Sequence, residues 1–315
     1  MLWLEKNLGI GLIWINQIDI SMDSLSQLTV VILTYKTNLQ ILLNCLNSID
    51  KKVKIMIIEN SAEFKEKDEL LKKFSNLSIE CTGYNFGFGG GNNFGFRKIS
   101  TQFALTLSPD TVCNKNFFEN IKLYLNEKIK FSIIGVTYPN KSIHLSFGYF
   151  TKQIKAQYDE NFLIEVDWVI GCAMLVNLDK FQDKKIFDEN FFIYFDEFDA
   201  CFNVIKDGGK VFSSKILLLE HLGNKGSLAA DPNYKETTDK FRDWHWMWSQ
   251  FYFYKKNYSF IYALRKFFFR LIRFFIGIII YKILGNQNKF NKSKYKFLGL
   301  YNSMIGKPSF FRLGD

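Results

Sequence analysis

The sequence predicts an α/β protein built on a mainly parallel β-sheet that is flanked by helices. Short apolar runs without polar alternation, such as residues 28–33 and 55–58, are typical of strands buried on both faces. Stretches with apolar residues at helical spacing separate these runs. A chain of 315 residues with 48% hydrophobic content is also long enough to bury a full core.

The predicted elements alternate along the chain. Their order is a strand at 28–33, a helix at 39–49, a strand at 55–58, a charged helix ending near 74, a strand at 103–107, a helix around 117–125, and strands at 133–136 and 216–219. In sheets of this kind, ligands bind beyond the carboxyl ends of the strands. The residues that directly follow each strand are therefore the candidates for a functional site.

The charge divides the chain into parts. Residues 255–315 hold thirteen Lys or Arg and one acid, a net charge of +12, whereas the remaining 254 residues carry −2. A nucleic-acid binder would spread basic charge over its folded domain, so nucleic acid is not an expected partner. We predict an N-terminal extension over 1–27, in which Met22 is an alternative start, a folded domain over 28–254, and a basic tail over 255–315.

Polar residues follow the first two strands. Thr34 and Tyr35 come after the first strand, and Glu59 and Asn60 come after the second. An aromatic ring beside a carboxylate and an amide can hold a nucleoside, and an ordinary polar strand end is the alternative.

A glycine-rich run occupies residues 85–95 (NFGFGGGNNFG). Its glycines permit positive φ angles and a close approach of the backbone to a ligand. Asn92 and Asn93 are predicted to cap a helix that follows, whose N-terminus would favour a diphosphate. A flexible loop without a ligand is the alternative.

Two further strand ends carry candidate metal ligands. Asp110 follows the third strand and is placed to hold Mg²⁺ or Mn²⁺ together with substrate phosphates. His221 follows the strand at 216–219. The alternatives are a turn residue for Asp110 and a hydrogen-bonded surface residue for His221.

The segment 187–203 is rich in acids and aromatics. If a helix begins near Asp196, Phe198, Cys201, Phe202 and Ile205 form an apolar face. Asp196 and Asp199 then point to the opposite side, and Glu197 flanks the apolar face. A partly enclosed carboxylate has a raised pKa, which suits a general base. Acids that only complement the helix dipole are the alternative.

In order, these segments resemble the family 2 glycosyltransferases with a GT-A fold, in particular rhamnosyltransferase-like members. The resemblance covers residues 28–227. It rests on seven segments, LTVVILTYK, IIENS, NFGFGGGNN, LSPDT, VDWVIGCAMLV, FDENFFIYFDEFDAC and HLGNKGS.

The resemblance implies a role for each site residue. The nucleotide-sugar site would consist of Thr34, Tyr35, Glu59, Asn60, Asn85, Gly87, Gly90, Asn93 and Asp110. Asp110 and His221 would face a Mg²⁺ or Mn²⁺ ion, although Ser108 replaces the first acid of the D-x-D motif. The acceptor side would include Trp168, Gly171 and Asp199. Glu197 would be the catalytic base and Asp196 the second candidate, because this chain has Asp-Glu where the family usually has Glu-Asp.

The implied reaction is an inverting sugar transfer from a nucleotide-diphosphate donor, with rhamnose favoured, to a glycan or lipid-linked acceptor in cell-surface polysaccharide synthesis. One alternative is a nucleotidyltransferase that makes nucleotide sugars. Such enzymes place a glycine-rich loop directly after the first strand, where this chain has Thr34, Tyr35 and Lys36. The other is a catalytically degenerate scaffold at the membrane.

The basic tail predicts membrane attachment. Its most apolar part, residues 267–284, is interrupted by Arg270, Arg273 and Lys282, and its longest uncharged run has eight residues. Spanning a bilayer takes ~20 residues, so an interfacial helix on anionic headgroups fits better. The expected location is cytoplasmic, peripheral at the inner face of the cell membrane. A helix packed on the folded domain is the alternative.

Overall fold

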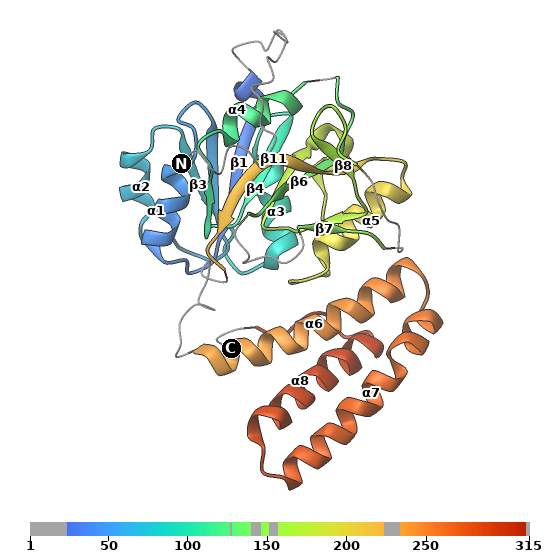
Figure 1. The fold of residues 1–315 in the computed structure, drawn as a ribbon. Helices are drawn as coiled ribbons and strands as arrows, with labels where there is room; N and C mark the ends of the chain where they lie inside the picture. Colours follow the sequence, from blue (N-terminus) through green and yellow to red (C-terminus); the bar gives the residue numbers. More distant parts are fainter. Residues whose placement is uncertain (1–23, 127, 140–145, 151–156, 224–233, 313–315) are drawn as a thin grey trace, which may run out of the picture.

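The computed structural model describes residues 24–126, 128–139, 146–150, 157–223 and 234–312 (Figure 1). The predictions for residues 1–23, including the alternative start at Met22, lie outside the described residues. The same holds for positions 224–227 of the HLGNKGS segment.

A nine-stranded sheet forms the centre of the fold, in the order β3-β2-β1-β4-β10-β6-β11-β5, with β8 also paired to β11. The strands are β1 (Leu28–Thr34), β2 (Lys54–Glu59), β3 (Leu77–Cys81), β4 (Phe103–Leu107), β5 (Thr111–Cys113), β6 (Ile133–Thr137), β8 (Leu163–Glu165), β10 (Ala173–Asn177) and β11 (Val211–His221). A short pair, β7 (Phe147–Gly148) and β9 (Trp168–Val169), lies apart from it. The α/β prediction is therefore confirmed.

The sheet is mixed, whereas the sequence predicted a mainly parallel one. Strands β3, β2, β1 and β4 run parallel, but β10 is antiparallel to both β4 and β6. All five residues of β10 are buried. A continuous apolar run reports burial on both faces of a sheet, and it carries no information on strand direction.

Helices cover both faces of the sheet (Figure 1). The helices of the sheet domain are α1 (Leu39–Asn47), α2 (Lys67–Lys73), α3 (Gly87–Lys98), α4 (Phe117–Ile121) and α5 (Asp196–Lys206). Side chains of α1 and α4, such as Leu46 and Ile121, belong to one buried cluster. Side chains of α3 and α5, such as Phe96 and Cys201, belong to the other. This double cover explains why the strands read as continuous apolar runs.

The glycine-rich run is itself a helix, α3, so the prediction that Asn92 and Asn93 cap a later helix is wrong. Its glycines let the helix approach the sheet. A Cβ on Gly91 would lie 2.4 Å from the Leu33 side chain, and one on Gly95 would lie 2.9 Å from both Ile58 and Val31. Close tertiary packing outweighs the low helix propensity of glycine here.

The last three helices form a bundle next to the sheet domain (Figure 1). They are α6 (Lys235–Asn257), α7 (Phe260–Ile283) and α8 (Gln287–Met304). They pack on one another around Met247, Phe251, Ala263, Phe267 and Leu300. The bundle thus includes α6, which lies within the range predicted for the folded domain. Among the helices described, none is long and apolar enough to cross a membrane.

Candidate active site

The carboxyl ends of β1 and β2 meet in a buried polar cluster. Thr34 Oγ1 donates a hydrogen bond to Glu59 Oε2 at 2.7 Å, and Ser61 Oγ donates to Glu59 Oε1 at 2.7 Å. Glu59 is only 2% exposed. The parallel pairing of Thr34 with Glu59 places the two side chains side by side. Tyr35, directly after Thr34, remains partly exposed at this edge.

Asn60 connects this cluster to the start of α3. Its Nδ2 donates to Asn85 Oδ1 and to the Gly87 carbonyl oxygen, both at 2.9 Å. Its Oδ1 accepts from the Phe86 amide at 2.9 Å. Gly87 has a φ of +79°, and a Cβ there would lie 2.1 Å from the Phe192 carbonyl oxygen. Asn60, Asn85 and Gly87 therefore form one rigid corner beside Thr34 and Glu59.

Asp110 and His221 come together at the neighbouring strand ends. Thr111 pairs with His221 across β5 and β11, and the Leu222 amide donates to the Asp110 carbonyl oxygen at 2.9 Å. Asp110 Oδ1 lies 3.6 Å from His221 Nε2. Asp110 is 3% exposed.

This donor pair suits a divalent cation that is also bound by a substrate. A carboxylate and an imidazole are both common ligands of such ions. Across the described ranges, no three His, Cys, Asp or Glu side chains are grouped so that they could hold a metal ion by themselves. Mg²⁺ typically binds through one or two carboxylates plus substrate phosphates and water. The pair therefore fits a metal held jointly with a diphosphate.

Cys172, which lies in the VDWVIGCAMLV segment expected at the acceptor side, packs against His221 in the structure. Its Sγ lies 3.6 Å from His221 Nε2, and its carbonyl oxygen accepts from the Ser108 amide at 2.7 Å. Burial raises the pKa of the Cys172 thiol to about 12, and the charges of Asp110 and Glu197 add to the shift. The thiol thus lies in a poorly solvated position against the His221 ring. Its position in the VDWVIGCAMLV segment was the signal available in the sequence.

Helix α5 begins at Asp196, as predicted, after a strained turn. Tyr194 and Phe195 have φ angles of 66° and 65°, a region that non-glycine residues rarely adopt. The Phe195 ring stacks on Phe198 at 5.0 Å and contacts Trp246 of α6 at 5.4 Å. Such strain is often found at functional sites, where the surrounding packing maintains it. Here the turn sets the direction in which the first residues of α5 project.

The two acids at the start of α5 have different environments. Asp196 is 1% exposed, and burial, together with the charge of Glu197 and a hydrogen bond to it, raises the pKa of Asp196 well above its ordinary value. Glu197 is only partly buried. An added Cβ on Gly171 would lie 3.5 Å from Glu197 Cβ, so the backbone before Cys172 runs beside Glu197. Glu197 therefore stands beside the Gly171 and Cys172 backbone, while Asp196 is enclosed.

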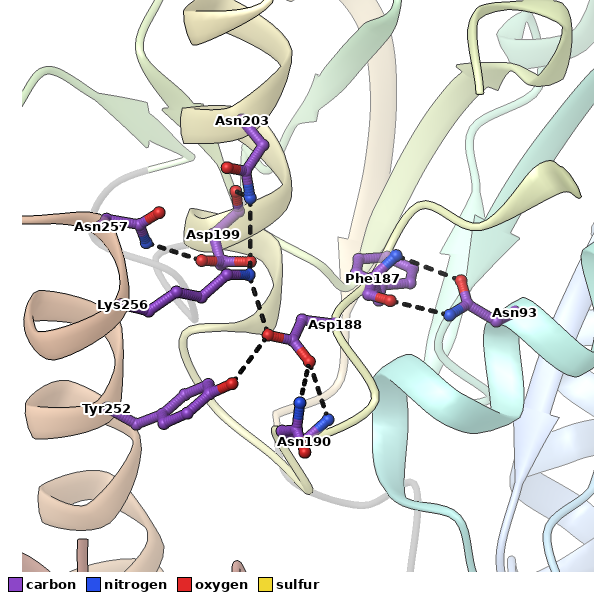
Figure 2. Close-up of polar contacts among 9 residues, drawn as sticks. All are labelled: Asn93, Phe187, Asp188, Asn190, Asp199, Asn203, Tyr252, Lys256 and Asn257. Carbon is purple, nitrogen blue, oxygen red and sulfur yellow. Dashed lines mark hydrogen bonds and ion pairs between the residues drawn. The ribbon is translucent and has the colours of Figure 1, made fainter. Parts of the chain in front are cut away.

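The structure places the three residues predicted for the acceptor side in two different surroundings. Trp168 packs on Phe198 of α5, with ring centroids 4.6 Å apart, and Gly171 is buried between Phe88 and Glu197. Asp199, by contrast, binds Lys256 and Asn257 of α6 (Figure 2). Asp196 and Asp199, which were predicted to lie opposite the apolar face of α5, are buried, whereas Ile205, which was predicted on that face, is 38% exposed.

Asn93 also lies apart from the nucleotide cluster. Its Nδ2 donates to the Phe187 carbonyl oxygen at 2.9 Å, and its Oδ1 accepts from the Phe187 amide at 3.1 Å (Figure 2). Gly90 is buried on α3, where an added Cβ would lie 2.9 Å from Phe86 Cβ. The structure thus uses Asn93 to join α3 to the segment that leads towards α5.

A large cavity of about 1010 Å³ lies at the other end of the sheet. Its lining includes Ser132 before β6 and Lys210 before β11, and it reaches Asp199 and Lys256. These strand beginnings are opposite the carboxyl ends that carry Thr34, Glu59 and His221. The polar groups with the chemistry expected of a transferase are therefore not in this cavity.

Two characterised proteins are similar in sequence. The low-salt glycan biosynthesis hexosyltransferase Agl10 of Haloferax volcanii is 24% identical over 213 residues, which cover 61% of this chain and 66% of that protein. The rhamnosyltransferase WbbL of Escherichia coli K12 is 25% identical over 190 residues, 51% of this chain and 69% of that protein. The chain thus spans just under two thirds of the length of Agl10. No family model matches the chain.

A solved structure has the same fold. The mannosyltransferase PcManGT from Pyrobaculum calidifontis, determined in complex with GDP-Man and Mn²⁺, superposes with a TM-score of 0.53 at 9% identity, covering 88% of this chain and 87% of that one. Neither sequence relative is a nucleotidyltransferase or a scaffold. In sequence the chain is similar to two glycosyltransferases, and its fold is that of a solved GT-A glycosyltransferase.

Proposed function

We propose that this chain is an inverting glycosyltransferase that moves a hexose from a nucleotide-diphosphate donor to a hydroxyl of a glycan or lipid-linked acceptor. The observation that carries the proposal is the position of Glu197. This acid stands beside Gly171 and Cys172. Cys172 in turn contacts His221, which lies 3.6 Å from Asp110 at the carboxyl edge of the sheet. The buried cluster of Thr34 and Glu59 occupies the same edge, two strands away.

The side chains of the site have different roles in sugar transfer. Glu59 and Asn60 are held by Thr34, Asn85 and the Gly87 backbone, which makes a pre-shaped nucleoside site beside Tyr35. Glu197 accepts the proton of the attacking acceptor hydroxyl. Trp168, packed on Phe198, offers an aromatic surface for a sugar ring. The reaction inverts the anomeric carbon because the acceptor displaces the nucleoside diphosphate in one step.

Asp110 and His221 would hold a divalent cation, Mg²⁺ or Mn²⁺, at the donor diphosphate. A bound cation supplies charge neutralisation for the departing nucleoside diphosphate. The Mn²⁺ and GDP-mannose in PcManGT support this class of donor and cofactor. The rhamnosyltransferase WbbL supports a deoxyhexose such as rhamnose as the sugar.

A donor panel tests the proposal. With Mn²⁺ or Mg²⁺ present, one nucleoside-diphosphate sugar is expected to raise the melting temperature and to be hydrolysed slowly in the absence of acceptor. Both effects should disappear in EDTA. If no donor in the panel shifts the melting temperature or is hydrolysed, the transferase proposal is wrong and the scaffold alternative regains support.

We further propose that the bundle attaches the protein to an anionic membrane surface, at the cytoplasmic face. Besides the residues that pack in the bundle, α7 carries an exposed apolar stripe at helical spacing, consisting of Phe268, Phe269, Ile272, Phe275, Ile276, Ile279, Ile280 and Ile283. Phe269 and Ile283 are each 79% exposed. Arg265, Lys266, Arg273 and Lys282 lie on the same helix. An apolar stripe with neighbouring cations matches an interface rich in anionic lipid.

A double substitution, Phe269→Asp with Ile283→Asp, tests the membrane proposal. Burying a large apolar side chain contributes about 1.5–3 kcal/mol, so the change should weaken binding to phosphatidylglycerol vesicles by about tenfold or more. The control is Leu71→Asp on α2, which is exposed on the sheet domain. Equal sedimentation of the double variant and the wild type would reject the membrane role of α7.

A further inference from the structure

A charge cluster, in which Asp199 is buried and Lys256 is exposed, joins the bundle to the helix that carries Glu197 (Figure 2). Lys256, near the end of α6, places its Nζ 2.6 Å from Asp199 Oδ2 on α5 and 2.8 Å from Asp188 Oδ2. Asn257 Nδ2 donates to Asp199 Oδ1 at 2.7 Å, and Tyr252 donates to Asp188 Oδ2 at 3.1 Å. The last two turns of α6 thus hold two separate segments of the sheet domain.

Lys256 is the cation that offsets two enclosed carboxylates. The side chain of Asp199 is 1% exposed and that of Asp188 is 15% exposed. Burial raises the pKa of Asp199 despite the hydrogen bonds from Lys256 and Asn257. Burial also works against ionisation of Asp188, but Lys256 and the Asn190 amide outweigh it and lower the pKa of Asp188. Removing the lysine would leave two like charges together in a poorly solvated place.

The cluster connects to the active site through short paths. The Asp199 amide donates to the Phe195 carbonyl oxygen at 2.8 Å, so it closes the first turn of α5 onto the strained residue before Asp196. Ser249 of α6 donates to the Ile193 carbonyl oxygen at 2.9 Å, which fixes the approach to that turn. In the sequence, Glu197 lies between Ile193 and Asp199, the residues of these two contacts.

A second path leads from the cluster to the glycine-rich helix. Asn190 donates from its amide and its side chain to Asp188 Oδ1, at 3.0 and 2.7 Å. The preceding Phe187 is held by Asn93 of α3 through both backbone groups (Figure 2). The cluster around Lys256 therefore ties α3, α5 and α6 to one another.

We infer that Lys256 is a positioning residue for transfer, and that the bundle is part of the catalytic unit as well as its attachment to the membrane. The inference rests on the proposed function. By holding Asp199 and Asp188, Lys256 fixes the first turn of α5 and hence the direction of the Glu197 carboxylate. It touches neither substrate nor reacting atoms. A membrane that engages α7 would then act on the same rigid body that carries the base.

The test compares the full-length variants Lys256→Met, Lys256→Arg and Lys255→Met in the absence of vesicles. Lys255→Met is the matched control, because it removes the same charge one residue earlier. Lys256→Met is expected to lower kcat by about 10- to 100-fold, the scale of a small misplacement of a catalytic group, with the KM for the donor nearly unchanged. Lys256→Arg should restore most of the rate, since its guanidinium can pair with both carboxylates.

The pH profile separates positioning from general destabilisation. Without the lysine, the folded-state pKa values of Asp188 and Asp199 both rise, so the folded form binds protons more tightly than the unfolded chain. The variant's deficit in kcat and melting temperature should therefore be smallest at acidic pH and grow as the pH rises through these raised values. A deficit that is constant with pH would overturn the charge-based argument.

Hydrogen exchange supplies a readout that is independent of activity. The amides of α5 should exchange faster in Lys256→Met than in Lys255→Met. If Lys256→Met does not fold, Asn257→Ala is the milder variant; it removes one hydrogen bond to Asp199 and should also speed exchange in α5. Unchanged α5 exchange overturns the positioning role even if transfer is observed. If the wild-type protein transfers no sugar while the α5 amides still exchange faster in the variants, only the proposed function is refuted.

Discussion

Glu197→Gln is expected to lower the kcat of sugar transfer by about 10²- to 10⁴-fold, the usual contribution of a general base. The amide has nearly the same shape as the carboxylate but cannot accept the proton of the acceptor hydroxyl. Because Glu197 lies away from the Thr34 and Glu59 cluster, donor affinity should change little. Steady-state kinetics with saturating donor, together with a binding isotherm for the donor, measure both quantities.

Asp196→Asn is the matched comparison for this prediction. Burial raises the pKa of Asp196 well above its ordinary value, so Asn, which does not ionise, should be a mild replacement there. The loss of kcat should be far smaller than for Glu197→Gln. Loss of transfer in Asp196→Asn with full transfer in Glu197→Gln would assign the base to Asp196.

The stability of Asp196→Asn should also depend on pH in a defined direction. A group whose pKa is raised on folding stabilises the folded state below its unfolded pKa, and that contribution is lost as the pH rises towards the folded pKa. The wild type therefore loses stability over this range through Asp196, by at most about 1.4 kcal/mol per pH unit. The variant lacks this loss. The melting temperature of the variant minus that of the wild type should therefore increase as the pH rises.

Asp110→Asn is expected to produce the second large effect, the loss of metal-dependent donor binding. Asp110 supplies the carboxylate of the pair with His221, and Ser108 stands where a second acid would be. Removing a ligand should cost more than removing a supporting contact, so apparent Mn²⁺ affinity should fall by more than about 100-fold. Titration of Mn²⁺ in the presence of a nucleoside diphosphate, followed by calorimetry, measures this affinity.

Whereas Asp110→Asn removes an acid from the proposed metal site, Ser108→Asp adds one two residues away. Ser108 is partly exposed and lies two residues before Asp110, so an acid there should add a ligand and tighten Mn²⁺ binding. If Asp110→Asn binds Mn²⁺ and nucleotide as the wild type does, the metal site is not at Asp110 and His221. Weaker Mn²⁺ binding in Ser108→Asp would show that the serine position does not face the ion.

Much of this site was predictable because strand ends are local features. The continuous apolar runs located β1, β2 and β4, and Thr34, Glu59 and Asp110 follow from those positions. The start of α5 at Asp196 was also predicted. The apolar run at 216–219 also located His221, which the structure brings within 3.6 Å of Asp110. Each of these depends on a few consecutive residues, so a single sequence contains the information.

Other features depended on contacts between distant parts of the chain. Asn93 binds Phe187, and Asp199 binds Lys256, across separations that no local pattern encodes. The glycine-rich run was predicted as a loop because glycine disfavours helices in isolation, whereas packing on Leu33 and Ile58 selects the helix.

The sequence alone determined the α/β class, the strand-end acids and the concentration of positive charge in the tail, since composition and periodicity record burial and charge directly. Only the tertiary structure distinguished the two acids at the start of α5. Asp196 and Glu197 are neighbours with nearly the same chemistry, and their difference arises from surroundings. Asp196 is enclosed and has a raised pKa, whereas Glu197 is partly open beside Cys172, because consecutive residues of a helix project in different directions.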